Sequence, residues 1–210
     1  MKLAIFGATG GTGKLLLEQA LEAGDHVVAF VRNPSKLNIR HECLTVVQGE
    51  LADEAMVEHA VSDADAVISV LGPRGGSKGK PITRGMQNII EGMKKQHVRR
   101  LIISSTLSAK DPNDSPDLRA NVLVNLVKFT MHAAYEEIVS VAETVRKSEL
   151  DWTIVRLTTL NNNAKSGKVR VGYLGRGEVG SGISRADLAE FMLKQVKDTK
   201  YLREAPVISN

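Results

Sequence analysis

The sequence GATGGTGK, residues Gly7 to Lys14, follows directly on the apolar run KLAIF. A glycine-rich turn between a buried strand and a helix binds phosphate groups through the backbone N–H groups at the helix start. Two ligands are compatible with such a turn: the triphosphate of a nucleotide that is split, or the pyrophosphate of a dinucleotide. The residues around the glycines distinguish the two.

The triphosphate pattern requires Gly, four residues, Gly-Lys and then Ser or Thr. When Gly13 and Lys14 are aligned with the Gly-Lys pair of this pattern, Ala8 stands where the first glycine belongs. Leu15 stands where a hydroxyl is needed to bind Mg²⁺. Because the loop would lack its metal ligand, the sequence argues against a nucleoside triphosphatase.

The dinucleotide interpretation fits better, although the spacing Gly7-x-x-Gly10-x-x-Gly13 differs from GxGxxG. Glycines at these positions permit a tight turn out of the strand and a close approach of the backbone to the pyrophosphate. Lys14 is then a surface residue of the following helix. The contacts predicted from this turn are Gly7, Thr9, Gly10, Gly11, Thr12 and Gly13.

The end of the second predicted strand, HVVAFVR, indicates which dinucleotide is bound. NAD sites usually place Asp or Glu about 20 residues after the glycines, where the carboxylate binds the ribose hydroxyls. Here the strand ends in Arg32, and Ser35 and Lys36 follow shortly after it. A guanidinium can pair bidentately with a 2′-phosphate, with Ser35 or Lys36 assisting. The sequence therefore favours NADP(H) over NAD(H).

Three further strand ends are expected at the same crevice, since ligands of doubly wound sheets bind at the carboxyl edge. The residues after the third strand are expected to flank the adenine, and those after the fourth to pass under the nicotinamide-side ribose. Hydroxyls that end the fifth strand either bind nicotinamide or substrate, or merely terminate the strand; both interpretations stay open. The predicted contacts are Glu50, Leu51, Leu71, Gly72, Ser104 and Ser105, with Thr106 beside them.

Along the chain, apolar strands alternate with amphipathic helices, which predicts a parallel sheet covered on both faces. We expect a single α/β domain over 1–210, a Rossmann-like doubly wound sheet. Its dinucleotide-binding core would cover 1–106, and 107–210 would add the remaining strands, helices and a small substrate-side wall. A long helical pattern over 118–147 is predicted to break near 130–132, and Ser184 to cap the last helix.

Composition limits the remaining function classes. The chain is 42% hydrophobic and 25% charged, which is typical of a globular protein, and no run is long enough to span a membrane. The net charge is +4, but basic clusters are scattered and aromatics are only 4%, so nucleic-acid binding is a weak alternative. The single cysteine, Cys43, excludes an internal disulfide. A buried inert thiol, a cytoplasmic location and no metal site are expected.

Several motifs together resemble one family: GATGGTG after KLAIF, Arg32, the GDxxD-like turn at 49–53, SELDWTIVR at 148–156 and ISRADLA at 183–189. They look like the atypical short-chain dehydrogenase/reductases, and within them the NmrA-like NAD(P)H-binding group. That group includes NADH-flavin reductases and the flavin reductase/biliverdin-IXβ reductase. The resemblance implies a Rossmann-like fold and NAD(P)H-dependent oxidoreductase activity.

This chain departs from the family in its proton-transfer residues. Typical short-chain dehydrogenases use Tyr-x-x-x-Lys, in which the lysine lowers the tyrosine pKa. None of the three tyrosines, Tyr135, Tyr173 and Tyr201, has Lys four residues later. In addition, Leu157 follows Arg156 where similar proteins often have Pro, and Glu50 stands where Asp is common. The missing pair argues against an alcohol dehydrogenase or epimerase of the usual type.

Flavin reduction needs no strong protein acid or base, because the enzyme mainly stacks two rings and excludes water. The leading hypothesis is therefore an NADPH-dependent reductase of a planar acceptor such as FMN, FAD, a quinone or a linear tetrapyrrole. A non-catalytic NADP(H)-sensing NmrA-like regulator is the alternative, and either a monomer or a homodimer is expected. The candidate catalytic residues are Thr106, Tyr135 and Arg74. The candidate walls over the nicotinamide are Pro73, Phe129 and His132. For Phe129 and His132, simple packing in a helical stripe is favoured over a substrate contact.

Overall fold

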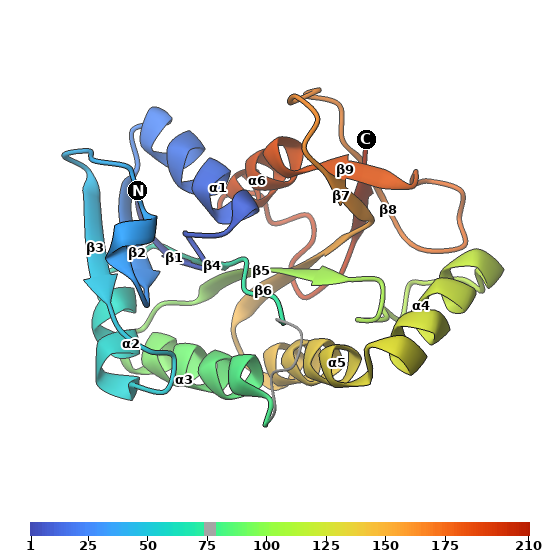
Figure 1. The fold of residues 1–210 in the computed structure, drawn as a ribbon, viewed down its shortest axis with the longest axis horizontal. Coiled ribbons are helices and arrows are strands. Elements are labelled where there is room, and N and C mark those ends of the chain that lie inside the picture. Colours follow the sequence, from blue (N-terminus) through green and yellow to red (C-terminus); the bar gives the residue numbers. More distant parts are fainter. Residues whose placement is uncertain (74–78) are drawn as a thin grey trace.

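The computed structural model describes residues 1–73 and 79–210 (Figure 1). Its main sheet has eight strands in the order β3-β2-β1-β4-β5-β6-β10-β8. All neighbouring strands pair in parallel except β8, which runs antiparallel to β10. The strands are β1 (Lys2–Phe6), β2 (His26–Val31), β3 (Leu44–Gln48), β4 (Ala66–Ser69), β5 (Arg100–Thr106), β6 (Asp151–Leu157), β8 (Arg170–Gly172) and β10 (Val207–Ser209).

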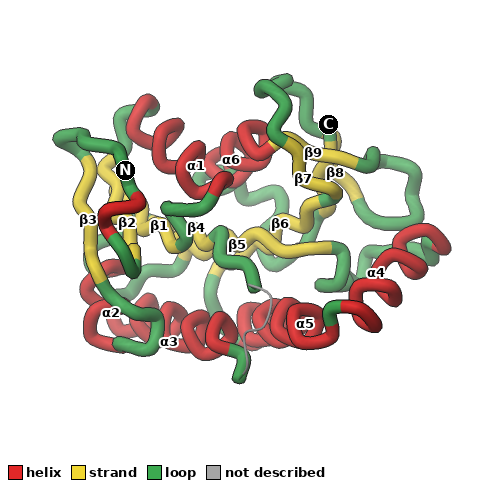
Figure 2. The backbone as a smooth tube through the Cα atoms, viewed as in Figure 1, coloured by secondary structure: helices red, strands yellow, loops and turns green. Residues whose placement is uncertain are grey.

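Helices cover both faces of this sheet, as Figure 2 shows. On one face lie α1 (Gly11–Glu22) and α6 (Arg185–Lys194). On the other lie α2 (Glu54–Val61), α3 (Pro81–Lys95) and α5 (His132–Lys147). The predicted doubly wound parallel sheet is therefore confirmed; the division of the chain near residue 106 stays a prediction.

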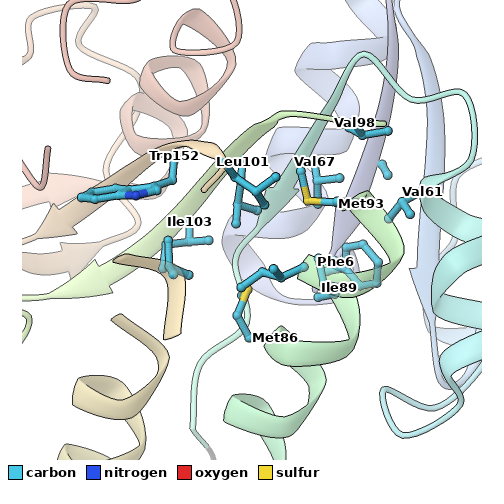
Figure 3. Close-up of a cluster of buried hydrophobic side chains, with 14 of the residues drawn as sticks. Phe6, Val61, Val67, Met86, Ile89, Met93, Val98, Leu101, Ile103 and Trp152 are labelled. Carbon is cyan, nitrogen blue, oxygen red and sulfur yellow. The ribbon is translucent and has the colours of Figure 1, made fainter. Parts of the chain in front are cut away.

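Each face of the sheet has its own hydrophobic core because successive strand residues point in opposite directions. In β1, Leu3 and Ile5 pack toward α1 and α6, whereas Ala4 and Phe6 pack toward α2 and α3. Figure 3 shows the second core, in which Phe6 lies near Met86 and Ile89 of α3. The two cores fix the carboxyl ends of the central strands, where the predicted ligand contacts lie.

The helical stretch after β5 is interrupted as predicted. It forms α4 (Leu118–Thr130) and α5, separated by Met131, whose backbone leaves the helical region at φ −130° and ψ 46°. A short 3-10 helix (Pro34–Lys36) follows β2, and β7 (Thr159–Asn161) pairs in parallel with β9 (Gly182–Ser184). Ser184 caps α6 as predicted, because its side chain accepts from the Asp187 N–H.

Some local expectations were wrong. β3 is not buried on both faces: Thr45 and Val46 are exposed, since β3 is the edge strand. Cys43 is half-buried rather than buried. β8 has only three residues, and the three-residue strands β7, β9 and β10 were not predicted. Elements this short carry too few residues for a periodic pattern.

A buried ion pair ties the loop after β5 to the sheet. The fully buried Arg156 guanidinium of β6 donates to both carboxylate oxygens of Asp114 at 2.7 Å. The Leu174 N–H also donates to Asp114, and Arg156 Nε donates to the Ala205 carbonyl at 2.5 Å. Burial alone raises the pKa of Asp114, but the hydrogen bonds from Arg156 and the backbone lower it below its ordinary value. Arg156 therefore joins three segments that are distant in sequence.

In the described residues, no helix has the length and apolar character needed to cross a membrane.

Candidate functional site

The glycine-rich turn closes on itself where β1 ends and α1 begins. Gly7 has φ +92°, and the Gly10 N–H donates to its carbonyl at 3.0 Å. A Cβ on Gly13 would lie 2.1 Å from the Gly7 oxygen, so this turn requires glycine at that position. The first N–H groups of α1 have no intrahelical acceptor, and no side chain among the described residues caps them. The turn therefore presents N–H groups to an anion.

A cleft of about 530 Å³ extends from this turn across the carboxyl edge of the sheet. Its volume is within the range of small-molecule sites. Backbone from the ends of β1, β2, β3 and β4 lines it, as expected for a doubly wound sheet. The predicted contacts that line the cleft are Gly7, Thr9, Gly10, Arg32, Glu50, Leu51, Leu71 and Gly72.

Three predicted contacts, Gly11, Gly13 and Lys36, line neither this cleft nor the pocket beside it. Gly11 packs under the side chain of Arg185, and Gly13 is enclosed within the turn. Lys36 ends the 3-10 helix and is exposed. These positions shape the turn or flank the cleft rather than forming its wall.

Two exposed cations, Arg32 and Arg84, line the cleft. Arg32 follows β2 and, within residues 1–73 and 79–210, has no carboxylate within ion-pair distance. Arg84 lies in the first turn of α3 and also lines the cleft. The sequence reasoning missed Arg84, although a basic residue near the start of the helix after the fourth strand was a usable signal.

A second pocket of about 230 Å³ adjoins the cleft. The two share Val70, Leu71, Gly72 and Ile82, so they meet at the end of β4 and the start of α3. The hydroxyl-bearing residues in this second pocket are Thr12 of α1 and Ser104, Ser105 and Thr106 of β5, and the apolar residues are Val70, Leu71, Pro73, Ile82, Ile138, Val141, Leu157, Leu160 and Leu188.

One carboxylate lines this apolar pocket. Glu137 of α5 is only 2% exposed, and it accepts hydrogen bonds from the Ile82 N–H at 2.6 Å and the Thr83 N–H at 3.3 Å. Both N–H groups belong to the first turn of α3, where negative charge is stabilised. Glu137 thereby fixes the pocket wall at Ile82. No sequence signal indicated this residue, because its role depends on the packing of α3 against α5.

The structure does not bring the aromatic and imidazole candidates to the pocket. Tyr135 is half-buried on α5, with Lys128 Nζ 5.6 Å from its ring centre. Phe129 and His132 are exposed, so the expectation that both pack in a helical stripe was wrong. The reason is that α4 extends away from the sheet (Figure 1). Thr106 and Pro73 do line the pocket, and Arg74 lies outside the described residues.

A further arginine lies against the glycine-rich turn. The side chain of Arg185, the first residue of α6, is so near Gly11 that a Cβ there would be 3.1 Å from its Nε. Arg185 Nη1 donates to Asn162 Oδ1 at 2.6 Å. The sequence reasoning treated this segment only as a family motif and a helix start, and thus missed the cation.

The start of α6 is held in place by buried Asp187. Its carboxylate accepts from the Ser184 hydroxyl at 2.6 Å, the Gly167 N–H at 2.9 Å and the Asn210 amide at 2.9 Å. Burial alone raises the pKa of Asp187, but these hydrogen bonds outweigh it and lower the pKa to about 2. The carboxylate thus fixes the helix end that carries Arg185.

Comparison with known sequences connects this cleft to a ligand class. The sequence model of a family described as NAD(P)H-binding matches residues 7–199. An uncharacterised chloroplastic protein of Arabidopsis thaliana is 28% identical over 80% of this chain and 62% of its own length. A (4-alkanoyl-5-oxo-2,5-dihydrofuran-3-yl)methyl phosphate reductase of Streptomyces griseus is 26% identical over 78% of this chain and 50% of its own length. The chain therefore spans only part of the length of these two relatives.

Solved structures share the fold over essentially the whole chain. A short-chain dehydrogenase/reductase from Veillonella parvula has a TM-score of 0.81 and 20% identity, covering 100% of this chain and 94% of its own. A wide-type member from the same organism, solved in complex with NADP, has a TM-score of 0.79 and 22% identity with the same coverage. At such identities the likeness concerns the fold alone.

Proposed function

Because the chain belongs to the NAD(P)H-binding family of atypical short-chain dehydrogenase/reductases, we propose that it is an NADPH-dependent reductase of a planar acceptor. The acceptor class includes FMN, FAD, quinones and linear tetrapyrroles. The observation that carries this proposal is the apolar pocket of about 230 Å³ that adjoins the larger cleft at Val70 to Gly72. A reductase needs such a second pocket beside its cofactor, whereas a protein that only binds the dinucleotide does not.

The residues present fit an extended dinucleotide. The turn whose Gly13 could not carry a Cβ provides the pyrophosphate cradle, and the neighbouring Arg185 adds a positive charge. Arg32, together with Arg84 of the same cleft lining, supplies the cations that a 2′-phosphate requires. In this proposal the pyrophosphate site consists of Gly7, Thr9, Gly10, Gly11, Thr12 and Gly13, and the 2′-phosphate site of Arg32 and Lys36. The adenine is bound by Glu50 and Leu51, and the nicotinamide-side ribose by Leu71 and Gly72. The nicotinamide is bound by Ser104 and Ser105.

Bound NADPH supplies a hydride, and the acceptor takes up this hydride together with one proton from solvent. The protein's part is to position both rings and to exclude water from the space between them. Apolar side chains of the pocket provide the surface for a planar ring, and Thr106 provides a hydroxyl at its rim. Glu137 holds the wall at Ile82 through the start of α3.

Steady-state oxidation of NADPH by the purified full chain tests the proposal, with FMN, FAD, quinones and biliverdin as acceptors and NADH in parallel. Turnover with at least one acceptor is expected, with NADPH preferred. Replacing Arg32 by Ala should remove most of this preference, since a bidentate pair to the phosphate is lost. Equal turnover with both cofactors, unaffected by Arg32→Ala, would refute the cofactor assignment.

An NADP(H)-sensing regulator is the second candidate, because the NmrA-like resemblance fits a regulator as well as a reductase and the missing Tyr-x-x-x-Lys pair is compatible with both. Tyr135, the tyrosine nearest the pocket in sequence, has Val139 four residues later. Tight NADPH binding without oxidation by any acceptor in the same assay would select the regulator. A cytoplasmic location stays part of the proposal and rests on the single cysteine.

A further inference from the structure

Helix α4 exposes an apolar stripe to solvent. This α4 stripe consists of four side chains, with these exposed fractions: Leu118 80%, Val122 60%, Leu126 56% and Phe129 89%. Their spacing of four, four and three residues places them within one narrow arc of a helix that turns about 100° per residue. The opposite side of the helix is the one that packs on the protein, through residues such as Ala120 and Val124.

The concentration of exposed apolar side chains here is unusual for a monomer. Eight large hydrophobic residues are exposed in the described part of the chain, and six of them lie between 118 and 131. These six are the four residues of the stripe together with Leu123 and Met131. Single exposed apolar residues are normal, but contiguous patches of several hundred Å² mark interaction sites. α4 also stands at the edge of the molecule, beyond the end of α5 (Figure 1).

The proposed reductase site does not account for this surface. None of the six residues lines the cleft or the adjoining pocket. The stripe therefore requires a separate explanation.

We propose that the α4 stripe packs against the same stripe of a second copy of this chain, with the two α4 helices antiparallel around a twofold axis. A twofold contact joins identical surfaces, and an apolar stripe is complementary to itself. Spacings of four and three residues on one face also form the seam of paired helices. The four side chains of the stripe are 56% to 89% exposed and together supply several hundred Å², a large part of the roughly 800 Å² per partner in standard interfaces.

Charge favours the antiparallel arrangement. Arg119 lies beside the stripe at the first turn of α4, and the helix LRANVLVNLVKFT contains no acidic residue. In a parallel pair the two helix dipoles would point in the same direction, which is unfavourable. In an antiparallel pair each Arg119 lies near the C-terminal end of the partner helix, where a cation is stabilised, and Lys128 of the last turn lies on the other flank of the stripe.

Sedimentation velocity and light scattering of the full chain over a wide concentration range test the proposal. The wild-type chain is expected to be a dimer that dissociates on dilution. Phe129→Glu and Val122→Glu should weaken association by more than about 100-fold, because each would bury a charge at an apolar interface. Both positions are exposed, so the far-UV circular dichroism should not change. Asn121→Glu adds the same charge to the same helix, at an exposed position about 100° around the helix from the centre of the stripe, and is the matched control, expected to stay dimeric.

Several results would overturn the proposal. One is a wild-type chain that is monomeric at every concentration, and another is a dimer that Asn121→Glu disrupts as much as Phe129→Glu does. A monomer that co-sediments with anionic phospholipid vesicles, and loses this binding with Phe129→Glu, would assign the stripe to a lipid surface instead. These outcomes are independent of NADPH binding and turnover, so they do not depend on the proposed reductase function.

Discussion

Replacing Gly13 by Ala tests the geometry of the glycine-rich turn. The new Cβ would lie 2.1 Å from the Gly7 oxygen and 2.8 Å from the Ala8 Cα, both backbone atoms. Relief of the first contact requires a backbone shift of roughly 1 Å in the pyrophosphate cradle, and displacements of that size cost about 100-fold in positioned sites. The overpacked turn should also lose roughly 1–3 kcal/mol of stability.

Isothermal titration with NADPH, combined with urea unfolding, measures both effects. Gly24→Ala is the matched control at the other end of α1. Gly24 has φ +80°, and no heavy atom lies within 4 Å of the place that a methyl group would occupy, so this variant should lose stability without losing NADPH affinity. If Gly13→Ala bound NADPH as tightly as the wild-type chain does, the assigned pyrophosphate cradle would be wrong.

Three further predictions concern Arg185, Asp187 and Arg156. Arg185→Ala should weaken NADPH and NADH binding about equally, roughly tenfold, because the Arg185 guanidinium acts on the pyrophosphate that both cofactors carry. Arg32→Ala should weaken NADPH binding alone. An effect of Arg185→Ala on NADPH but not on NADH would contradict the role assigned to Arg185. The folded-state pKa of Asp187, about 2, lies below its ordinary 3.8, so its stabilisation is complete above about pH 4 and is lost as the pH falls toward 2. This contribution is on the order of 2 kcal/mol, and acid unfolding of Asp187→Asn should lack that part of the slope. Arg156→Ala should cost roughly 3 kcal/mol in urea unfolding by leaving Asp114 without its partner, and a loss below about 1 kcal/mol would refute that role.

The central sheet was predictable from sequence because its strands and helices are long enough to show a period. The glycine turn and Arg32 were also predictable, since each follows a recognisable strand end, and the structure places both at one cleft. The break at Met131 was predictable to within a residue or two.

The rest depends on tertiary contacts that no local pattern records. Glu137 matters because α5 places it at the first turn of α3, and Arg185 matters because α6 packs beside α1. Phe129 was expected to pack because apolar residues usually do, yet α4 presents it to solvent. In each case the sequence determines the helix, whereas its neighbours determine which face is functional.

Anaerobic single-turnover mixing of the NADPH-loaded full chain with FMN, or with a quinone, measures hydride transfer to a planar acceptor. We expect oxidation of one NADPH per acceptor reduced, at a rate far above the protein-free reaction and slower in a Leu157→Trp variant that fills the apolar pocket. An NADPH complex that reduces neither these acceptors nor FAD or biliverdin above the protein-free rate would contradict this expectation.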